Sequence, residues 1–173
     1  MSDRHLMYLI GEPGIGKTTL MRALTKDHPY EEAAQPFAHK VYDNGVWELG
    51  RDREDFGGTD ALAMDVQPDV LQFMESIHPR YVMAEGDRLA NKGFFTEMRR
   101  LGYTLHVYHL TGEGLATQRR LARGSKQNET WIKGRRTKSK ALAEWLDAEE
   151  IYPTLDATVY VGLLNDPVSE RFR

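Results

Sequence analysis

The chain has 173 residues, of which 40% are hydrophobic and 28% are charged, and its formal net charge is −3, values that suit one globular domain over residues 1–173. The sequence has no cysteine, which excludes a disulfide framework and a cysteine-based zinc site, and no apolar run reaches the roughly 20 residues of a membrane-spanning helix. We therefore expect no membrane partner and a reducing, cytoplasmic location.

A glycine-rich loop stands between a predicted strand and a predicted helix at the start of the chain. Residues 6–10 form an apolar run of strand length, and apolar residues recur at helical spacing over 20–24. Between them, Gly11-Glu-Pro-Gly-Ile-Gly-Lys17-Thr18 matches the phosphate-binding pattern G-x-x-x-x-G-K-[ST]. Successive N–H groups of such a loop turn inward around an anion at the positive end of the helix. The sequence therefore predicts a nucleoside triphosphate site.

The residues of this loop have distinct expected roles. Lys17, expected to be an exposed loop lysine, places a positive charge on the β- and γ-phosphates, and Thr18 offers a hydroxyl to Mg²⁺. We expect ATP and Mg²⁺ as cofactors. The predicted ATP-binding residues of the loop are Gly11, Gly14, Ile15, Gly16, Lys17, Thr18 and Thr19.

A β-hairpin and a charged loop are expected next. Asn44-Gly45 separates β-prone runs at 37–42 and 46–49, which is a strong hairpin signal. Many small kinases insert an acceptor-binding element here, so residues 37–66 are the predicted acceptor region. Residues 50–65 show no helical or strand period and are expected to form a surface loop that carries functional residues. Its candidate carboxylates are Asp52, Asp55, Asp60 and Asp65.

Asp60 is the predicted general base, because it follows Gly57-Gly58, where the backbone can approach an acceptor closely. Asp65 and Glu85 are the competing choices for the base, and Asp65 is otherwise assigned to acceptor binding. A helix over residues 68–77 and a buried strand over 81–85 follow. Because that strand ends in an acid, Glu85 is the predicted Mg²⁺-side carboxylate. Which of these acids or Asp87 is the base stays open.

The second half of the chain continues the alternation of strands and helices. Helices are predicted over 91–101, 114–123 and 139–150, strands over 104–110 and 157–164, and a mobile loop over 124–138. The pattern predicts an α/β fold of the P-loop kinase type, with a central parallel five-stranded sheet flanked by helices, a hairpin insert and an arginine-rich lid. Ligands bind at the carboxyl ends of such strands, so Asn165, after the last strand, is expected near the nucleotide.

Basic residues are concentrated between residues 119 and 140. This segment holds nine basic residues and one acid, a net charge of +8, so the other residues must carry −11 for the chain to total −3. Residues 112–140 lie where nucleotide kinases carry the lid that closes over ATP. Arg119 and Arg123 are predicted to neutralise the negative charge of the phosphates during transfer, and Arg119 is also predicted to bind ATP. The residues predicted to bind the acceptor are Asp65, Arg88, Trp131, Lys133, Arg135 and Arg136.

Four segments together resemble a known family. They are residues 11–18, Phe56-Gly-Gly-Thr-Asp60-Ala-Leu, Glu85-Gly-Asp-Arg-Leu89, and Arg123-Gly-Ser-Lys-Gln127 followed by Trp131 and Gly134-Arg-Arg-Thr137. They are similar to phage-encoded phosphate-loop kinases identified as 5-hydroxymethyluridine DNA kinases.

The resemblance implies an activity, a partner and a location. The activity is transfer of the γ-phosphate of ATP to the hydroxymethyl group of the modified base in DNA, a step in thymidine hypermodification. The partner is DNA that contains a hydroxymethylated pyrimidine, and the location is the host cytoplasm. A kinase of free nucleosides or nucleoside monophosphates remains the main alternative, and a nucleotide-binding module without transfer activity is a third.

Overall fold

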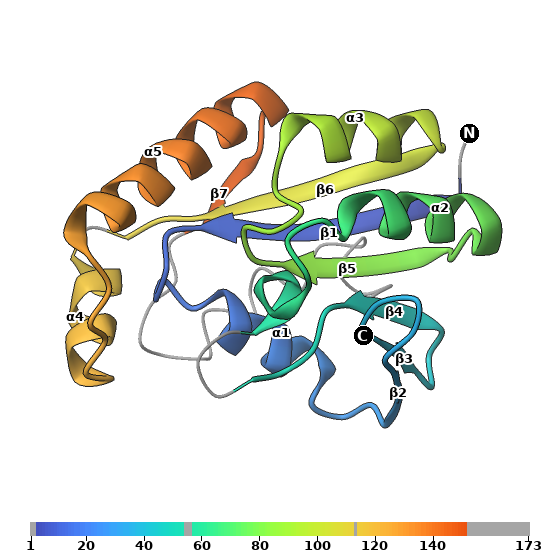
Figure 1. Cartoon of the computed structure of the whole chain (residues 1–173), viewed down its shortest axis with the longest axis horizontal. Coiled ribbons are helices and arrows are strands. Elements are labelled where there is room, and N and C mark those ends of the chain that lie inside the picture. Colours follow the sequence, from blue (N-terminus) through green and yellow to red (C-terminus); the bar gives the residue numbers. More distant parts are fainter. Residues whose placement is uncertain (1–2, 54–56, 113, 152–173) are drawn as a thin grey trace.

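The computed structural model describes residues 3–53, 57–112 and 114–151, and its centre is one seven-stranded sheet (Figure 1). The strands are β1 (Arg4–Gly11), β2 (Tyr30–Ala33), β3 (His39–Tyr42), β4 (Val46–Leu49), β5 (Tyr81–Glu85), β6 (Tyr103–Leu110) and β7 (Glu149–Ile151). The helices are α1 (Lys17–Thr25), the short 3-10 helix η1 (Gly58–Ala61), α2 (Gln67–Ile77), α3 (Lys92–Arg100), α4 (Leu115–Ala122) and α5 (Glu129–Leu146).

The sheet has the order β2-β3-β4-β5-β1-β6-β7, so the prediction of five strands is wrong. Strands β4, β5, β1, β6 and β7 are parallel to one another, and β2 and β3 extend the sheet in antiparallel fashion. The predicted hairpin is the pair β3–β4, but it is not a separate insert, because Val46 of β4 pairs with Tyr81 of β5 inside the same sheet. β2 was not predicted.

Two apolar cores lie on the two faces of the sheet. Leu6, Tyr8 and Ile10 of β1 face a large core with α2, α3 and α5, whereas Met7 and Leu9 face a smaller core under α1 (Figure 1). Successive residues of a strand point to opposite faces, and a central parallel strand is therefore apolar throughout. Within the described part of the chain, no helix has both the length and the apolar character that a membrane span requires.

The last third of the described chain differs from the prediction. Residues 124–138 were expected to be a mobile loop, but α5 begins at Glu129 and runs without interruption to Leu146. Asn128 caps it, because its Oδ1 accepts a hydrogen bond from the Thr130 N–H at 2.7 Å. The helix was expected to continue to residue 150; instead it ends at Leu146, and β7 supplies the fifth parallel strand. The strand predicted at 157–164 and Asn165 lie outside the described residues.

Candidate active site

The phosphate-binding loop joins β1 to α1, and helix α4 packs closely against it. Gly14 has a φ of 86°, and a Cβ there would lie 2.9 Å from Arg120 Cγ and 3.2 Å from the carbonyl oxygen of Ala116 on α4. Glycine is therefore needed both for the backbone angle and for the approach of α4. Ile15 is fully buried in the smaller core and anchors the loop, while Thr19 is exposed on the first turn of α1.

Lys17 crosses the phosphate-binding loop and is buried, with 8% of its surface exposed. Its Nζ donates hydrogen bonds to the carbonyl oxygens of Gly11 at 2.7 Å and Glu12 at 3.2 Å. The expectation of an exposed lysine is wrong, because the loop folds around the ammonium group. The positive charge of Lys17 is thus held against the backbone of the phosphate-binding loop.

Thr18 and Glu85 form the predicted magnesium side of the site. The Thr18 hydroxyl donates to Glu85 Oε1 at 2.7 Å, and Glu85 is 3% exposed at the carboxyl end of β5. Burial raises the pKa of Glu85, and Lys17 and the Thr18 hydrogen bond oppose that rise. Mg²⁺ prefers one or two carboxylates together with waters and substrate phosphates. The described residues contain no cluster of three or more His, Cys, Asp or Glu side chains that could hold a metal. The Thr18 hydroxyl oxygen and the Glu85 carboxylate nevertheless fit Mg²⁺ in a nucleotide site.

The chain after β4 passes directly over Glu85. A Cβ at Gly58, whose φ is 62°, would lie 2.5 Å from both Glu85 Oε1 and the Glu85 carbonyl oxygen. A Cβ at Gly50 would lie 2.1 Å from the Gly58 carbonyl oxygen. Real side chains do not fit at such distances, so these glycines let the backbone pack on the buried carboxylate. This close packing places η1, which includes Asp60, beside the end of β5.

Asp60 holds the loop that follows β5. Its Oδ1 accepts hydrogen bonds from the backbone N–H groups of Asp87 at 2.9 Å and Arg88 at 3.1 Å. The Tyr8 hydroxyl of β1 also contacts this loop, donating a hydrogen bond to the Gly86 carbonyl oxygen at 2.9 Å. The general base predicted at Asp60 thus lies at the acidic end of β5, with one carboxylate oxygen engaged by the backbone.

Three of the candidate carboxylates, Asp60, Glu85 and Asp87, come together at the end of β5. Asp87 lies in the loop after Glu85, and burial raises its pKa while Lys17, Arg135 and Lys138 oppose the rise. The charge of Asp60 raises the pKa of both Glu85 and Asp87. These three acids therefore share one electrostatic environment. Asp65 is exposed on the turn before α2, and Asp55 lies outside the described residues.

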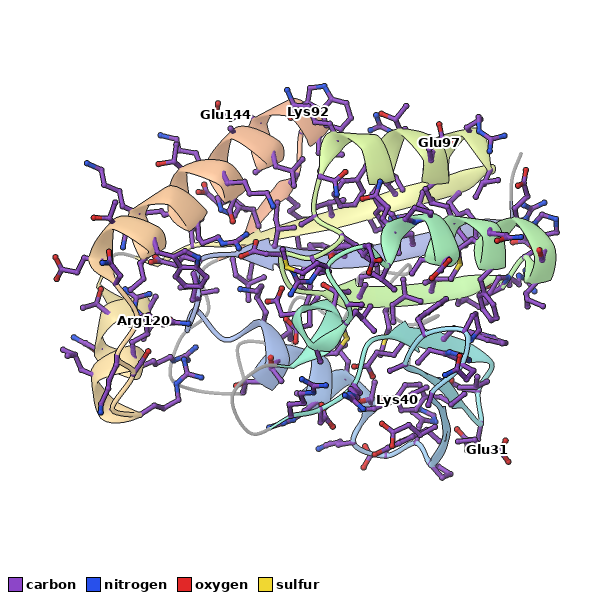
Figure 2. The ribbon with its side chains drawn as sticks, viewed as in Figure 1. Glu31, Lys40, Lys92, Glu97, Arg120 and Glu144 are labelled. Atoms are coloured by element: carbon purple, nitrogen blue, oxygen red, sulfur yellow. The ribbon has the colours of Figure 1, made fainter. Side chains whose placement is uncertain are left out.

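Arginines of α4 contact the backbone of the phosphate-binding loop. Arg119 Nη1 donates to the Ile15 carbonyl oxygen at 2.6 Å. Arg120, only 7% exposed, donates to the Pro13 carbonyl oxygen at 2.6 Å and to Glu12 Oε2 at 3.2 Å, and Figure 2 labels it where α4 meets the loop. Arg123 lies close by, with its Nη2 3.1 Å from the position of a Cβ on Gly14. Sequence reasoning assigned no site role to Glu12.

Helix α5 contacts both loops of the site through adjacent arginines. Arg136 Nη2 donates to Glu12 Oε2 at 2.8 Å, and Arg135 Nη1 lies 3.6 Å from Asp87 Oδ2. The Arg135 guanidinium also lies over the Trp131 ring, 5.1 Å from its centroid. Trp131 remains 40% exposed, and Lys133 is exposed on the same helix. Residues 129–138 of the predicted mobile loop thus belong to a helix with polar contacts to the phosphate-binding loop and to the loop after β5.

A cavity of about 270 Å³ extends from Thr18 along α1 toward β3 and β4. Lys40, labelled in Figure 2, is buried in its wall with Glu48 and Tyr42. Lys40 Nζ lies 3.0 Å from Asp52 Oδ2 and 3.9 Å from Glu48 Oε2, and the Tyr42 hydroxyl donates to the same Glu48 oxygen. The predicted acceptor region therefore contributes a network of paired charges next to the magnesium side.

Comparisons with known proteins agree with this architecture. A family model described as P-loop Nucleotide Kinase3 matches residues 1–170. Among solved structures, the chain is similar to a gluconokinase from Sinorhizobium meliloti 1021, with a TM-score of 0.53 and 10% sequence identity over 94% of this chain and 90% of that chain. At this identity the likeness shows the fold alone. A comparison with curated proteins gave no match.

Proposed function

The chain belongs to the P-loop Nucleotide Kinase3 family, and on that premise we propose that it is a DNA kinase. It transfers the γ-phosphate of ATP to the hydroxymethyl group of 5-hydroxymethyluridine in phage DNA, a step in thymidine hypermodification. The observation that carries the proposal is the position of α5. The Arg135 guanidinium on this helix contacts the Asp87 carboxylate in the loop after β5, and it also lies over the exposed ring of Trp131.

The residues of the site suit phosphoryl transfer to an alcohol. Lys17, Arg119 and Arg123 surround the phosphate-binding loop and would neutralise the charge that spreads over the transferred group. Thr18 and Glu85 would hold Mg²⁺, which would offset the negative charge of the phosphates. The acceptor hydroxyl oxygen forms the new bond to the γ-phosphorus as the bond to the β-phosphate oxygen breaks. Asp60 takes the hydroxyl proton, and ADP leaves.

The exposed surface of α5 suits a nucleic acid acceptor. DNA is a polyanion, and lysine and arginine contacts to its phosphates supply most of the affinity that does not depend on base sequence. Lys133 and Lys140 are exposed on α5, and Trp131 offers a ring on which a base can stack. A base that is modified in place must leave the duplex stack or be presented on a single strand. The site would then receive one exposed nucleotide of a longer strand.

The runner-up is a kinase of a free nucleoside monophosphate. The description of the family favours a nucleotide acceptor, and the net charge of −3 does not by itself favour DNA. Such an enzyme needs lid arginines but has no need for exposed lysines along α5. The two functions therefore differ in whether the acceptor must be part of a strand.

A panel of acceptors tests the proposal. ADP release would be measured with an oligonucleotide containing 5-hydroxymethyluracil, the same oligonucleotide with thymine, free 5-hydroxymethyldeoxyuridine, its 5′-monophosphate, and gluconate. We expect release above the acceptor-free background only with the hydroxymethylated oligonucleotide, and none with a Lys17→Met variant. Equal or faster release with the monophosphate would move the assignment to a nucleotide kinase, and release with gluconate alone would reject both.

A further inference from the structure

We propose that the surface where α3 meets α5 is a docking surface for the single-stranded DNA that flanks the modified base. The inference rests on the proposed function, because a free nucleotide has no flanking strand. We call this surface the strand track, and it consists of the side chains of Lys92, Arg99, Trp131, Arg135, Lys138 and Trp145. Sequence reasoning assigned no site role to Lys92, Arg99 or Trp145.

The members of the strand track on α5 lie along one edge of that helix. They are spaced by four, three and seven residues, which places them on the same side of an α-helix: Trp131, Arg135, Lys138 and Trp145. Glu144, which Figure 2 labels, precedes Trp145 and by the same spacing projects away from this edge. Its negative charge therefore does not oppose the cations of the strand track.

Two cations of α3 lie over the exposed ring of Trp145. Lys92 Nζ lies 5.6 Å and Arg99 Cζ 5.7 Å from the centroid of this ring, which is 39% exposed. Figure 2 labels Lys92 where the start of α3 meets the C-terminal end of α5. The other end of the edge repeats the arrangement, with Arg135 over Trp131. Each tryptophan can stack on a base while the cations beside it contact phosphates.

The positive charges of Lys92 and Arg99 are not compensated by acids. Both side chains are exposed, and neither forms an ion pair within residues 3–53, 57–112 and 114–151. By contrast, the neighbouring Arg100 pairs with Glu97 at 2.7 Å and with Glu75 at 3.7 Å. The indole ring beside Lys92 and Arg99 is neutral, so both charges remain available to a polyanion.

The strand track passes the loop after β5, which Asp60 holds. Lys138 Nζ donates to the Asp87 carbonyl oxygen at 3.3 Å, and Lys92 begins α3 just after this loop. Trp145 lies seven residues beyond Lys138, about 10 Å along the helix at 1.5 Å per residue. This distance is roughly three steps of a stacked strand at 3.4 Å per nucleotide. A strand whose modified base reaches Asp60 would therefore bring a flanking base to Trp145.

Binding measured without phosphoryl transfer tests the strand track. A trinucleotide with 5-hydroxymethyluracil at its centre, and the same trinucleotide extended by about six thymidylates on its 5′ or its 3′ side, would be titrated into the full-length protein with saturating ADP and Mg²⁺. We expect the extension on one side only to raise affinity by about 5- to 100-fold. Trp145→Leu should lose this gain, and Trp145→Phe should keep part of it, because a phenyl ring still stacks.

A salt series tests the cations with variants at exposed positions of α3. Lys92→Gln combined with Arg99→Gln should reduce the slope of log affinity against log salt for the extended strand by about 1.4, because each phosphate contact on a single strand contributes about 0.7. Arg100→Gln is the matched control, since it removes the same charge from the same helix, and the slope should stay unchanged. All variants should bind ADP and the trinucleotide as the wild type does.

The outcomes separate this inference from the proposed function. Equal affinity for the trinucleotide and both extended strands would overturn the inference, and so would a wild-type gain in both Trp145→Leu and the double charge variant. Oligoglutamate that competes with the extended strand, and binds as tightly, would show a surface for an acidic protein and would overturn it too. A one-sided gain that depends on Trp145, in a protein that fails to phosphorylate DNA, would reject the proposed function alone.

Discussion

Glu12 Oε2 in the phosphate-binding loop lies 2.8 Å from Arg136 Nη2 on α5, and the same oxygen accepts a hydrogen bond from Arg120 on α4 at 3.2 Å. A carboxylate in a loop that binds a triphosphate would repel the ligand if it stood alone. Two guanidinium groups compensate its charge. One acid thus joins both basic helices to the phosphate-binding loop and holds their arginines beside it.

Glu12→Gln should loosen this junction and lower kcat/KM for ATP by about 10-fold, because the arginines lose the carboxylate that orients them. The measurement is a double-mutant cycle with Arg136→Gln on kcat/KM. We expect a coupling of roughly 0.5–1 kcal/mol, at the low end of contacting pairs because Arg136 is partly exposed to solvent. Lys133→Gln, on an exposed position of α5, should show no coupling with Glu12→Gln. Additive effects of Glu12→Gln and Arg136→Gln would contradict a direct role for the pair.

Lys17→Met should reduce turnover by roughly 10²–10³-fold or more, because a charge aimed at the transferred phosphate is lost. Since Lys17 also donates to two loop carbonyl oxygens, the variant should be less stable by about 1–3 kcal/mol. Turnover at saturating ATP and thermal unfolding measure the two effects. Wild-type turnover in a folded variant would remove Lys17 from the site.

Asp60→Asn should lower the chemical step by roughly 10²–10⁴-fold while ATP affinity stays nearly unchanged. The asparagine Oδ1 can still accept the N–H groups of Asp87 and Arg88, so the loop after β5 should be retained. Asp60→Ala should lose both the base and this loop contact, which thermal unfolding would show. If Asp87→Asn abolishes single-turnover transfer while Asp60→Asn remains active, the base is Asp87.

Glu85→Gln should abolish turnover and yet stabilise the protein at neutral pH. Burial raises the folded-state pKa of Glu85 above its ordinary value of 4.5, so the wild type binds a proton more readily when folded than when unfolded. The stability from this group is present below pH 4.5 and is lost as pH rises through the folded-state pKa. The amide does not titrate, so the Tm difference should favour the variant at pH 8 and shrink toward pH 4.5.

Each kcal/mol by which Glu85→Gln increases the free energy of unfolding should raise Tm by roughly 2–4 °C. Glu144→Gln, at an exposed position of α5, serves as the control and should change Tm little at either pH. A Tm difference for Glu85→Gln that is the same at both pH values would show that ionisation of the buried carboxyl has no part in it.

Local patterns in the sequence predicted the phosphate-binding loop, because its glycines, Lys17 and Thr18 lie within eight consecutive residues. Glu85 was predictable as the acid at the end of an apolar strand. The Asn44-Gly45 turn was predictable too, but not the pairing of β4 with β5, since strands 46–49 and 81–85 meet only in the folded sheet. The count of strands was wrong for that reason.

The start of α5 and the charge pairs of the site were harder to predict. Gly134 and the dense basic residues hide the buried positions Ile132, Ser139 and Leu142, although Asn128 before Glu129 is a capping signal that could have revealed the helix. Glu12 and Arg136 are separated by 124 residues, and no local pattern links them. The partner of each arginine depends on the packing of α4 and α5.

Salt dependence tests whether α5 contacts DNA. Because Arg135 and Arg136 already pair with Asp87 and Glu12, the exposed Lys133 is the better candidate for a phosphate contact. Lys133→Ala should reduce the slope of log affinity against log salt by about 1 for any DNA sequence. Arg135→Ala should affect turnover more than this slope. A flat salt response in the wild type would argue against an extended nucleic acid ligand.

The most direct measurement is the identity of the phosphorylated product. The protein would be incubated with γ-labelled ATP and an oligonucleotide that carries one 5-hydroxymethyluracil, and the digested nucleosides would be separated and weighed by mass spectrometry. We predict that the label lies on the hydroxymethyl oxygen of that single base and that the thymine-containing oligonucleotide stays unlabelled. Label on a free nucleoside monophosphate, with none in the oligonucleotide under the same conditions, would contradict it.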